Sequence, residues 1–142
     1  MLSTDIRSDL NAARRERNKL RTTVLTTMLS EIRNREIEVR HELTDEEVVE
    51  VVNRQIKRRR EAAEQMRSGG RAELAEKEEQ EAEILATYLP PQLGVEEARA
   101  IVREAIAAGA NNVGAVMGAV MPKLKGRFDG RETNRIVREE LA

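Results

Sequence analysis

Apolar residues recur along this chain every three or four positions, which is the spacing of an amphipathic α-helix. Stretches with this spacing predict four helices in the first 91 residues, at about 3–15, 19–40, 44–67 and 71–89. Three shorter helices follow, at about 95–108, at about 113–121 and after Asp129. The pattern therefore predicts an all-α protein.

Residues that begin and end helices support these bounds. Thr44 and Glu47 have the spacing of a capping box, and Asp129 with Glu132 repeats it before the last helix. Ser3 is the expected cap of the first helix and Asn18 the expected break after it, while Asn111 or Asn112 caps the helix from about residue 113. Gly69, Gly70 and Gly109 stop helices, and Pro122 stops or kinks the one that it ends.

The same spacing identifies the core. Arg59 falls on the apolar face of its helix, so we expect its stem to be buried and its head to find a carboxylate or solvent. The carboxylates at Glu78, Glu79, Glu81 and Glu83 are interpreted as a solvated face. The inward side chains are expected to be Ile6, Leu10, Ala13, Leu20, Val24, Met28, Ile32, Val48, Val52, Ile56, Ala63, Leu74, Leu85, Leu89, Ala98, Ile101, Val102, Ala105, Ile106, Val116, Met117, Val120, Met121, Ile136, Val137 and Leu141.

Pro90-Pro91 ends the fourth helix, because proline lacks an amide donor and restricts the residue before it. We take it as the boundary between an N-terminal bundle of about four helices, residues 1–91, and a C-terminal lobe of three helices, residues 92–142. The two lobes are expected to fold separately and to touch.

Composition narrows the functional classes. Cysteine is absent, which excludes disulfides and thiolate metal sites. No signal peptide and no apolar run of membrane-spanning length is present, so we expect a cytoplasmic protein without membrane contact. The single histidine, His41, is interpreted as a surface residue, and no nucleotide-binding glycine loop occurs. We therefore expect no catalytic site, no metal and no cofactor.

The net charge of −1 hides basic clusters. Six of the eight Lys and Arg residues after residue 91 lie between Lys123 and Arg138. Arg131, Arg135 and Arg138 share one face of the last helix, and Lys123, Lys125 and Arg127 precede it. This cluster fits the phosphates of RNA, and the alternative is a solvated face paired with Glu132 and Glu139. A second cluster, Arg54, Lys57 and Arg58, is interpreted as a charged outer face.

Gly114 and Gly118 alternate with methionines on the helix from about residue 113. Glycine inside a helix costs roughly 1 kcal/mol relative to alanine, so it indicates a specific requirement. Close helix packing is the favoured explanation, and a docking surface is the other.

Together these residues resemble a known family. The segments Val113–Gly118, Met121–Gly130 and Asn134 are similar to the C-terminal signature of the GatB/YqeY family, and Tyr88–Leu93 resembles its hinge. The resemblance covers essentially the whole chain, as a stand-alone YqeY-like protein. It implies a helical bundle followed by a three-helix lobe, like the tail of the B subunit of tRNA-dependent amidotransferases, which are glutamine-dependent carbon–nitrogen ligases.

The resemblance also implies a function. The RNA-facing positions that it indicates are Gly114, Lys123, Lys125, Gly126, Arg127 and Asn134, to which the helix face adds Arg131, Arg135 and Arg138. The catalytic part of the B subunit has no counterpart in this chain. We expect a tRNA-associated accessory protein that is not an enzyme alone, or alternatively an adaptor that docks on an amidotransferase, an aminoacyl-tRNA synthetase or another partner.

Overall fold

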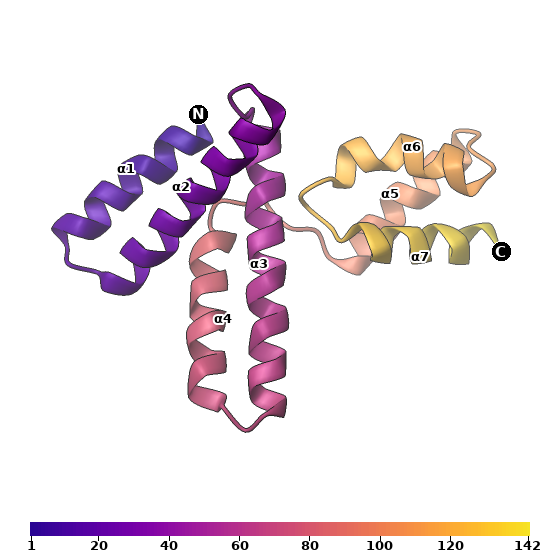
Figure 1. Ribbon diagram of the computed structural model, residues 1–142. Helices are drawn as coiled ribbons and strands as arrows, with labels where there is room; N and C mark the ends of the chain where they lie inside the picture. The colour runs from indigo at the N-terminus through magenta and orange to yellow at the C-terminus, as the bar shows by residue number, and fades with distance from the viewer. The chain divides into compact units, whose positions relative to one another are not determined.

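The computed structural model describes all 142 residues. They form seven α-helices and no strand, so the predicted all-α class is confirmed (Figure 1). The helices are α1 (Leu2–Arg15), α2 (Lys19–Val39), α3 (Asp45–Ser68), α4 (Ala72–Ala86), α5 (Val95–Ala107), α6 (Val113–Leu124) and α7 (Gly130–Leu141). They divide into two compact units, the N-terminal unit Met1–Leu89 and the C-terminal unit Pro90–Ala142. The predicted boundary after residue 91 separates two lobes that are expected to fold separately, and this expectation stays a prediction.

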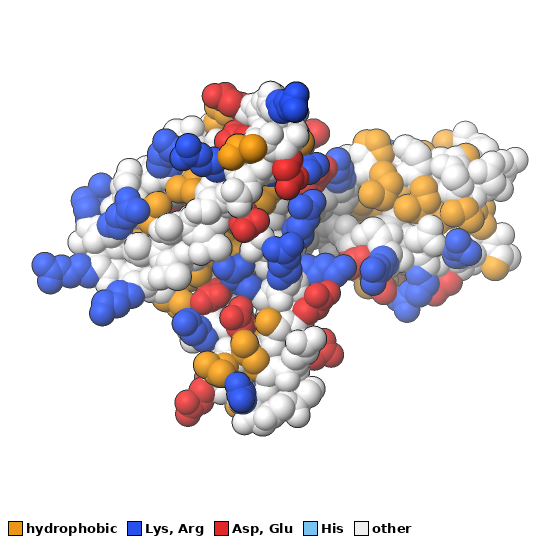
Figure 2. Space-filling model, in the orientation of Figure 1, with side chains coloured by type: hydrophobic (Ala, Val, Ile, Leu, Met, Phe, Trp, Pro, Cys, Tyr) orange, Lys and Arg blue, Asp and Glu red, His pale blue; other side chains and the backbone are white.

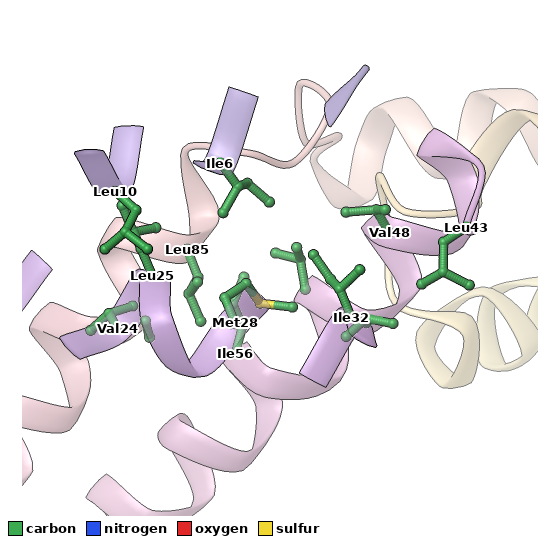
Figure 3. Close-up of a cluster of buried hydrophobic side chains, with 13 residues drawn as sticks. Ile6, Leu10, Val24, Leu25, Met28, Ile32, Leu43, Val48, Ile56 and Leu85 are labelled. Atoms are coloured by element: carbon green, nitrogen blue, oxygen red, sulfur yellow. The ribbon is translucent and has the colours of Figure 1, made fainter. Parts of the chain in front are cut away.

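Two helical hairpins build the N-terminal unit. α1 and α2 lie side by side, and so do α3 and α4, each pair being joined by a short turn (Figure 1). Their apolar faces meet in one core, drawn in Figure 3. Many of the fully buried side chains were predicted from helical spacing, among them Ile6, Val24, Met28, Val48, Val52 and Leu85, whereas Leu25 and Ala75 are fully buried and were not in the predicted set.

Local capping chemistry fixes several helix ends. Thr44 Oγ1 accepts from the Glu47 amide at 3.2 Å, and the Glu47 carboxylate accepts from the Thr44 amide at 3.1 Å, so the predicted capping box is confirmed. Asn18 caps α2 by accepting from the amide of Arg21. The cap predicted at Ser3 is wrong, because α1 already begins at Leu2, whose amide donates to Asp45 Oδ1 at 2.9 Å. A carboxylate from the start of α3 thus replaces the local cap.

The α3–α4 hairpin holds the clearest departures from the predicted core. Leu74 is 45% exposed, because Ala75 and Ala82 face α3 instead and let the two helices approach closely. Glu81 is buried rather than solvated, and its Oε2 lies 3.2 Å from Arg59 Nε. Arg59 has therefore found a carboxylate, which was one of the two outcomes expected for it.

The C-terminal unit has its own core, built from α5, α6 and α7. Val102, Val116, Val120, Leu124 and Ile136 are fully buried in it. α6 does not stop at Pro122, as one of the two alternatives held, but continues to Leu124. Pro122 has no amide hydrogen, so the carbonyl of Gly118 lacks its helical donor. Gly118 is exposed, and water can therefore bind this carbonyl. Burial of Leu124 holds the last turn in place.

The last helix is only partly capped as predicted. Asp129 Oδ1 accepts from the amides of Arg131 and Glu132 at 2.7 and 3.4 Å, which confirms the cap. The reciprocal half of the predicted box is wrong, because the Glu132 carboxylate accepts from Arg135 Nη2 at 2.6 Å. The Glu132 carboxylate therefore binds the Arg135 guanidinium instead of the backbone amide of Asp129.

Candidate functional site

The predicted RNA-facing residues lie around the turn between α6 and α7 and along α7. Lys123 is exposed in the last turn of α6, and Arg131 is exposed in the first turn of α7. Neither side chain has a hydrogen bond or an ion pair within the chain. These two cations flank a turn of five residues, 125–129, and are fully available to a ligand.

Gly126 and Arg127 hold the segment that precedes α5. The Leu93 amide donates to the Arg127 carbonyl at 2.9 Å, and Gln92 Nε2 donates to the Gly126 carbonyl at 2.8 Å. Arg127 Nε donates in turn to the Pro91 carbonyl at 3.1 Å. Two residues predicted to face RNA thus have a structural role, which sequence reasoning missed because their partners are more than 30 positions away.

The backbone at Gly126 explains its residue type. Its φ of +76° lies in the left-handed region, where a side chain strains the chain. Lys125, immediately before it, caps α6, and its amide donates to the Met121 carbonyl at 2.8 Å. The turn is therefore held by backbone geometry as well as by the segment packed on it.

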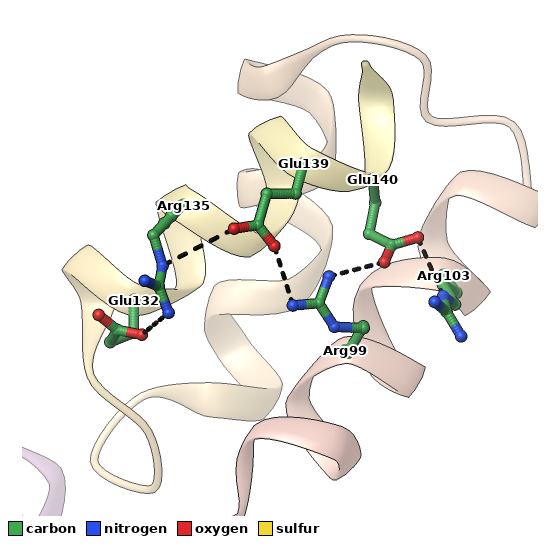
Figure 4. A network of polar contacts seen from close by, with 6 residues as sticks. All are labelled: Arg99, Arg103, Glu132, Arg135, Glu139 and Glu140. Carbon is green, nitrogen blue, oxygen red and sulfur yellow. Dashed lines mark hydrogen bonds and ion pairs between the residues drawn. The ribbon is translucent and has the colours of Figure 1, made fainter.

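The arginines of α7 are largely occupied within the helix. Arg135 contacts Glu132 at 2.6 Å and Glu139 at 3.9 Å, as the alternative of a charge-paired face anticipated (Figure 4). Arg138 Nε donates to Asn134 Oδ1 at 2.8 Å, so two further predicted RNA-facing residues bind each other. Of the three arginines on this face, only Arg131 has its guanidinium free.

A network between α5 and α7 continues from these arginines (Figure 4). Arg99 binds both Glu139 and Glu140, at 2.9 and 2.8 Å, and Arg103 binds Glu140 at 2.9 Å. Hydrogen bonds from Arg103 and then from Arg99 lower the pKa of Glu140 below its usual value. The carboxylates at the end of α7 are thereby neutralised, and they repel an approaching phosphate less than their number implies.

Gly114 and Gly118 do not serve close helix packing, contrary to the favoured explanation. A Cβ at Gly118 would meet no atom within 4 Å, and one at Gly114 would meet only Asn112 Oδ1, at 3.4 Å. Both glycines lie on the exposed face of α6 together with Ala115, Ala119 and Pro122. Hydrophobic side chains reach the surface over this helix in Figure 2. The structure therefore leaves an open face of small residues beside Lys123.

No group of three or more His, Asp or Glu side chains lies close enough together to hold a metal ion. His41 is exposed, with its Nδ1 2.8 Å from the Glu42 carbonyl and its Nε2 3.7 Å from Glu47. No helix combines the length and the apolar character needed to cross a bilayer.

Comparison with known proteins identifies the family. A family model described as "Yqey-like protein" matches residues 3–141. The chain is 30% identical over 127 residues to "Altered inheritance of mitochondria protein 41, mitochondrial" of Pyrenophora tritici-repentis, covering 86% of this chain and 70% of that protein. It is 36% identical over 89 residues to "Uncharacterized protein C22F3.15" of Schizosaccharomyces pombe, covering 63% and 72%. The chain belongs to the YqeY family.

Proposed function

We propose that this protein is a tRNA-associated accessory protein that binds RNA through the α6–α7 turn of its C-terminal unit and has no catalytic site of its own. The observation that carries the proposal is the pair of exposed, unpartnered cations, Lys123 and Arg131, on either side of that turn. Phosphate contacts of this kind supply most of the affinity of sequence-independent RNA binding. The partners in this proposal are tRNA and, with it, an amidotransferase or an aminoacyl-tRNA synthetase.

The structure determines which substitutions test the proposal. Arg127→Ala also removes the hydrogen bond to the Pro91 carbonyl, so its effect mixes binding with folding. Lys123→Ala/Arg131→Ala removes two exposed charges that support no other group. Exposed charge substitutions usually change stability by less than about 0.5 kcal/mol, so this double variant isolates binding.

Fluorescence anisotropy with labelled total tRNA, repeated at several salt concentrations, is the measurement. If Lys123 and Arg131 bind phosphates, the double variant binds tRNA more weakly, and its log–log salt slope is smaller by about 0.7–0.9 for each phosphate that is no longer neutralised. The matched control is Lys57→Ala/Arg58→Ala, which removes two exposed cations from α3. Equal losses of affinity in both variants, or no tRNA binding by the wild type even at low salt, would refute the proposal.

The open face of α6 favours a second candidate, an adaptor that docks on a protein partner. Small exposed residues such as Gly118 and Ala119 allow another backbone to approach closely. A pull-down after nuclease treatment, with Gly118→Leu as the variant, tests it. Recovery of one stoichiometric synthetase or amidotransferase by the wild type and not by the variant supports the adaptor.

The location that we propose is cytoplasmic. The name of the Pyrenophora relative places that protein in mitochondria, and this is the alternative compartment. Cell fractionation followed by immunoblotting distinguishes the two.

A further inference from the structure

A groove of about 740 Å³ runs along α1 and α2 in the N-terminal unit, and none of the positions discussed above for RNA lines it. Its volume lies within the roughly 300–1,000 Å³ typical of small-molecule sites. The side chains that line it combine three guanidinium groups, four hydroxyl groups and two carboxylates with a few apolar residues. They are Met1, Ser3, Thr4, Arg7, Leu10, Arg14, Thr26, Leu29, Ser30, Ile32, Arg33, Glu36, Glu42 and Leu43.

The three arginines of the groove have no partner in the protein. Arg7, Arg14 and Arg33 are exposed, and none of them makes a hydrogen bond or an ion pair. The chain pairs other arginines closely, as at Arg59 and Arg67, which bind carboxylates at 3.2 and 2.8 Å. Three free guanidinium groups around one hollow form a site for an anion, because each presents a planar fork of donors.

Helix geometry explains why these arginines line one groove, spread along its length. Arg7 and Arg14 are seven positions apart, so they share one face of α1 and are separated by about 10 Å along its axis. Arg33 lies on α2 three positions after the hydroxyl of Ser30, which also faces the groove. In an antiparallel hairpin these two faces lie opposite each other, and a ligand between them is reached from both helices.

The start of α1 adds further donors to the groove. The first amides of an α-helix have no partner within the helix, and the positive end of the helix dipole lies there. The Leu2 amide is satisfied by Asp45, whereas Ser3 and Thr4 follow it directly on the groove wall. Both residues line the same hollow as Arg7, so their hydroxyl groups are available to a ligand there.

The two carboxylates define what else the ligand carries. Glu36 Oε2 accepts from the Leu43 amide at 3.1 Å, which ties it to the loop before α3. Glu42 belongs to that loop, so both carboxylates lie where α2 ends, which is the end of the groove far from Arg14 and nearer to Arg33. Ionised carboxylates only accept hydrogen bonds, so they suit hydroxyl groups of the ligand.

We propose that the α1–α2 groove binds a phosphate ester of a hydroxyl-bearing molecule, with Arg7, Arg14 and Arg33, which are spread along the groove, as its phosphate-binding side chains. The ester is either a free sugar phosphate or a ribose phosphate of an RNA chain. In both cases the recognition is the same: guanidinium forks on phosphate oxygens and serine or threonine hydroxyls beside them. The site is separate from the α6–α7 turn and goes beyond the proposed function.

The test compares two triple variants of the full chain by isothermal titration calorimetry with inorganic pyrophosphate and with ribose 5-phosphate. Arg7→Ala/Arg14→Ala/Arg33→Ala removes every arginine of the groove, and Lys57→Ala/Arg58→Ala/Arg60→Ala removes three exposed cations from α3 outside it. Hydrogen bonds between charged groups are among the strongest in proteins, so we expect the groove variant to bind at least about tenfold more weakly. The control is expected to bind like the wild type.

A tRNA titration of the same variants distinguishes the two sources of phosphate. If the small ligands bind and only the groove variant loses them, the site takes a free phosphate ester. If they do not bind but the groove variant alone loses affinity for tRNA, the site binds the RNA backbone. If the two triple variants bind every probe with the same affinity, the proposed binding site in the groove is refuted. If Lys123→Ala/Arg131→Ala binds tRNA more weakly while the groove variant binds every probe as the wild type does, the result supports the proposed function and not this site.

Discussion

The pair formed by Arg59 and Glu81 offers a quantitative test of how the α3–α4 hairpin is held. The two side chains are only 12% and 11% exposed, and Arg59 Nε lies 3.2 Å from Glu81 Oε2. Arg59 Nη1 also donates to Gln55 Oε1 at 3.1 Å. Arg59→Ala leaves a buried carboxylate and a buried amide oxygen without their donor. Removing one partner of a buried pair costs about 3–5 kcal/mol, and the remaining exposure here reduces our expectation to about 2–3 kcal/mol.

Urea unfolding followed by far-UV circular dichroism measures this decrease in stability. For a unit of this size, 2–3 kcal/mol corresponds to a fall in melting temperature of roughly 10–20 °C. Arg59→Met/Glu81→Leu removes both charges and keeps the volume, so it is expected to recover most of the stability. Arg67 and Glu79 provide the matched control on the same two helices, because they are 46% and 43% exposed, and Arg67→Ala is expected to cost much less.

Two results would refute this reasoning. Arg59→Ala could unfold within about 0.5 kcal/mol of the wild type, as an ordinary surface substitution does. The double variant could also be as unstable as the single one, and packing of the arginine stem, rather than the unpaired carboxylate, would then explain the decrease.

Two further predictions concern backbone strain and pH. Arg40 ends α2 with a φ of +61°, so Arg40→Gly is expected to raise the free energy of unfolding by about 0.5–1 kcal/mol; a decrease would mean that the arginine side chain contributes more than its strain costs. The Tyr88 hydroxyl donates to Asp9 Oδ2 at 2.6 Å, and burial, followed by this hydrogen bond, raises the pKa of the phenol above its usual value. A raised folded-state pKa contributes stability that is complete below the unfolded value of about 10 and is lost as pH rises through the folded one. Melting temperatures of the wild type are therefore expected to fall more steeply at alkaline pH than those of Tyr88→Phe, and parallel pH profiles would contradict this.

The sequence predicts most of the features of this fold that depend on neighbours in the chain, with the Glu132 half of the second capping box as an exception. The Thr44–Glu47 box and the Asn112 cap each need only residues three positions apart, and both are present. Features that depend on distant partners were mispredicted. Leu74 is exposed because Ala75 and Ala82 set the register against α3, and Ser3 is no cap because Asp45 reaches the start of α1. Helical spacing alone specifies neither register nor distant caps.

The same distinction between local and distant contacts applies to the predicted RNA-facing residues. Their positions at the α6–α7 turn and on α7 follow from sequence spacing, but their availability does not. Arg127 binds the carbonyl of Pro91, and Arg135 binds Glu132 and Glu139, so charge alone overstates what the surface offers. Arg131 remains free although it lies on the same face. The test of RNA binding therefore rests on Lys123 and Arg131 and not on every basic residue of the segment.

For the α1–α2 groove, the sequence understates what the surface offers to a ligand. Arg7 and Arg14 are seven positions apart, a spacing that is visible in the sequence, yet an amphipathic helix on a protein surface ordinarily carries charges at such positions. The distinction comes from α2, whose Thr26, Ser30 and Arg33 line the same hollow. Two unremarkable polar faces become a candidate binding site only because the hairpin sets them against each other. A charged face therefore indicates a ligand when its guanidinium groups lack partners, as those of the groove do and as those of Arg135 and Arg138 do not.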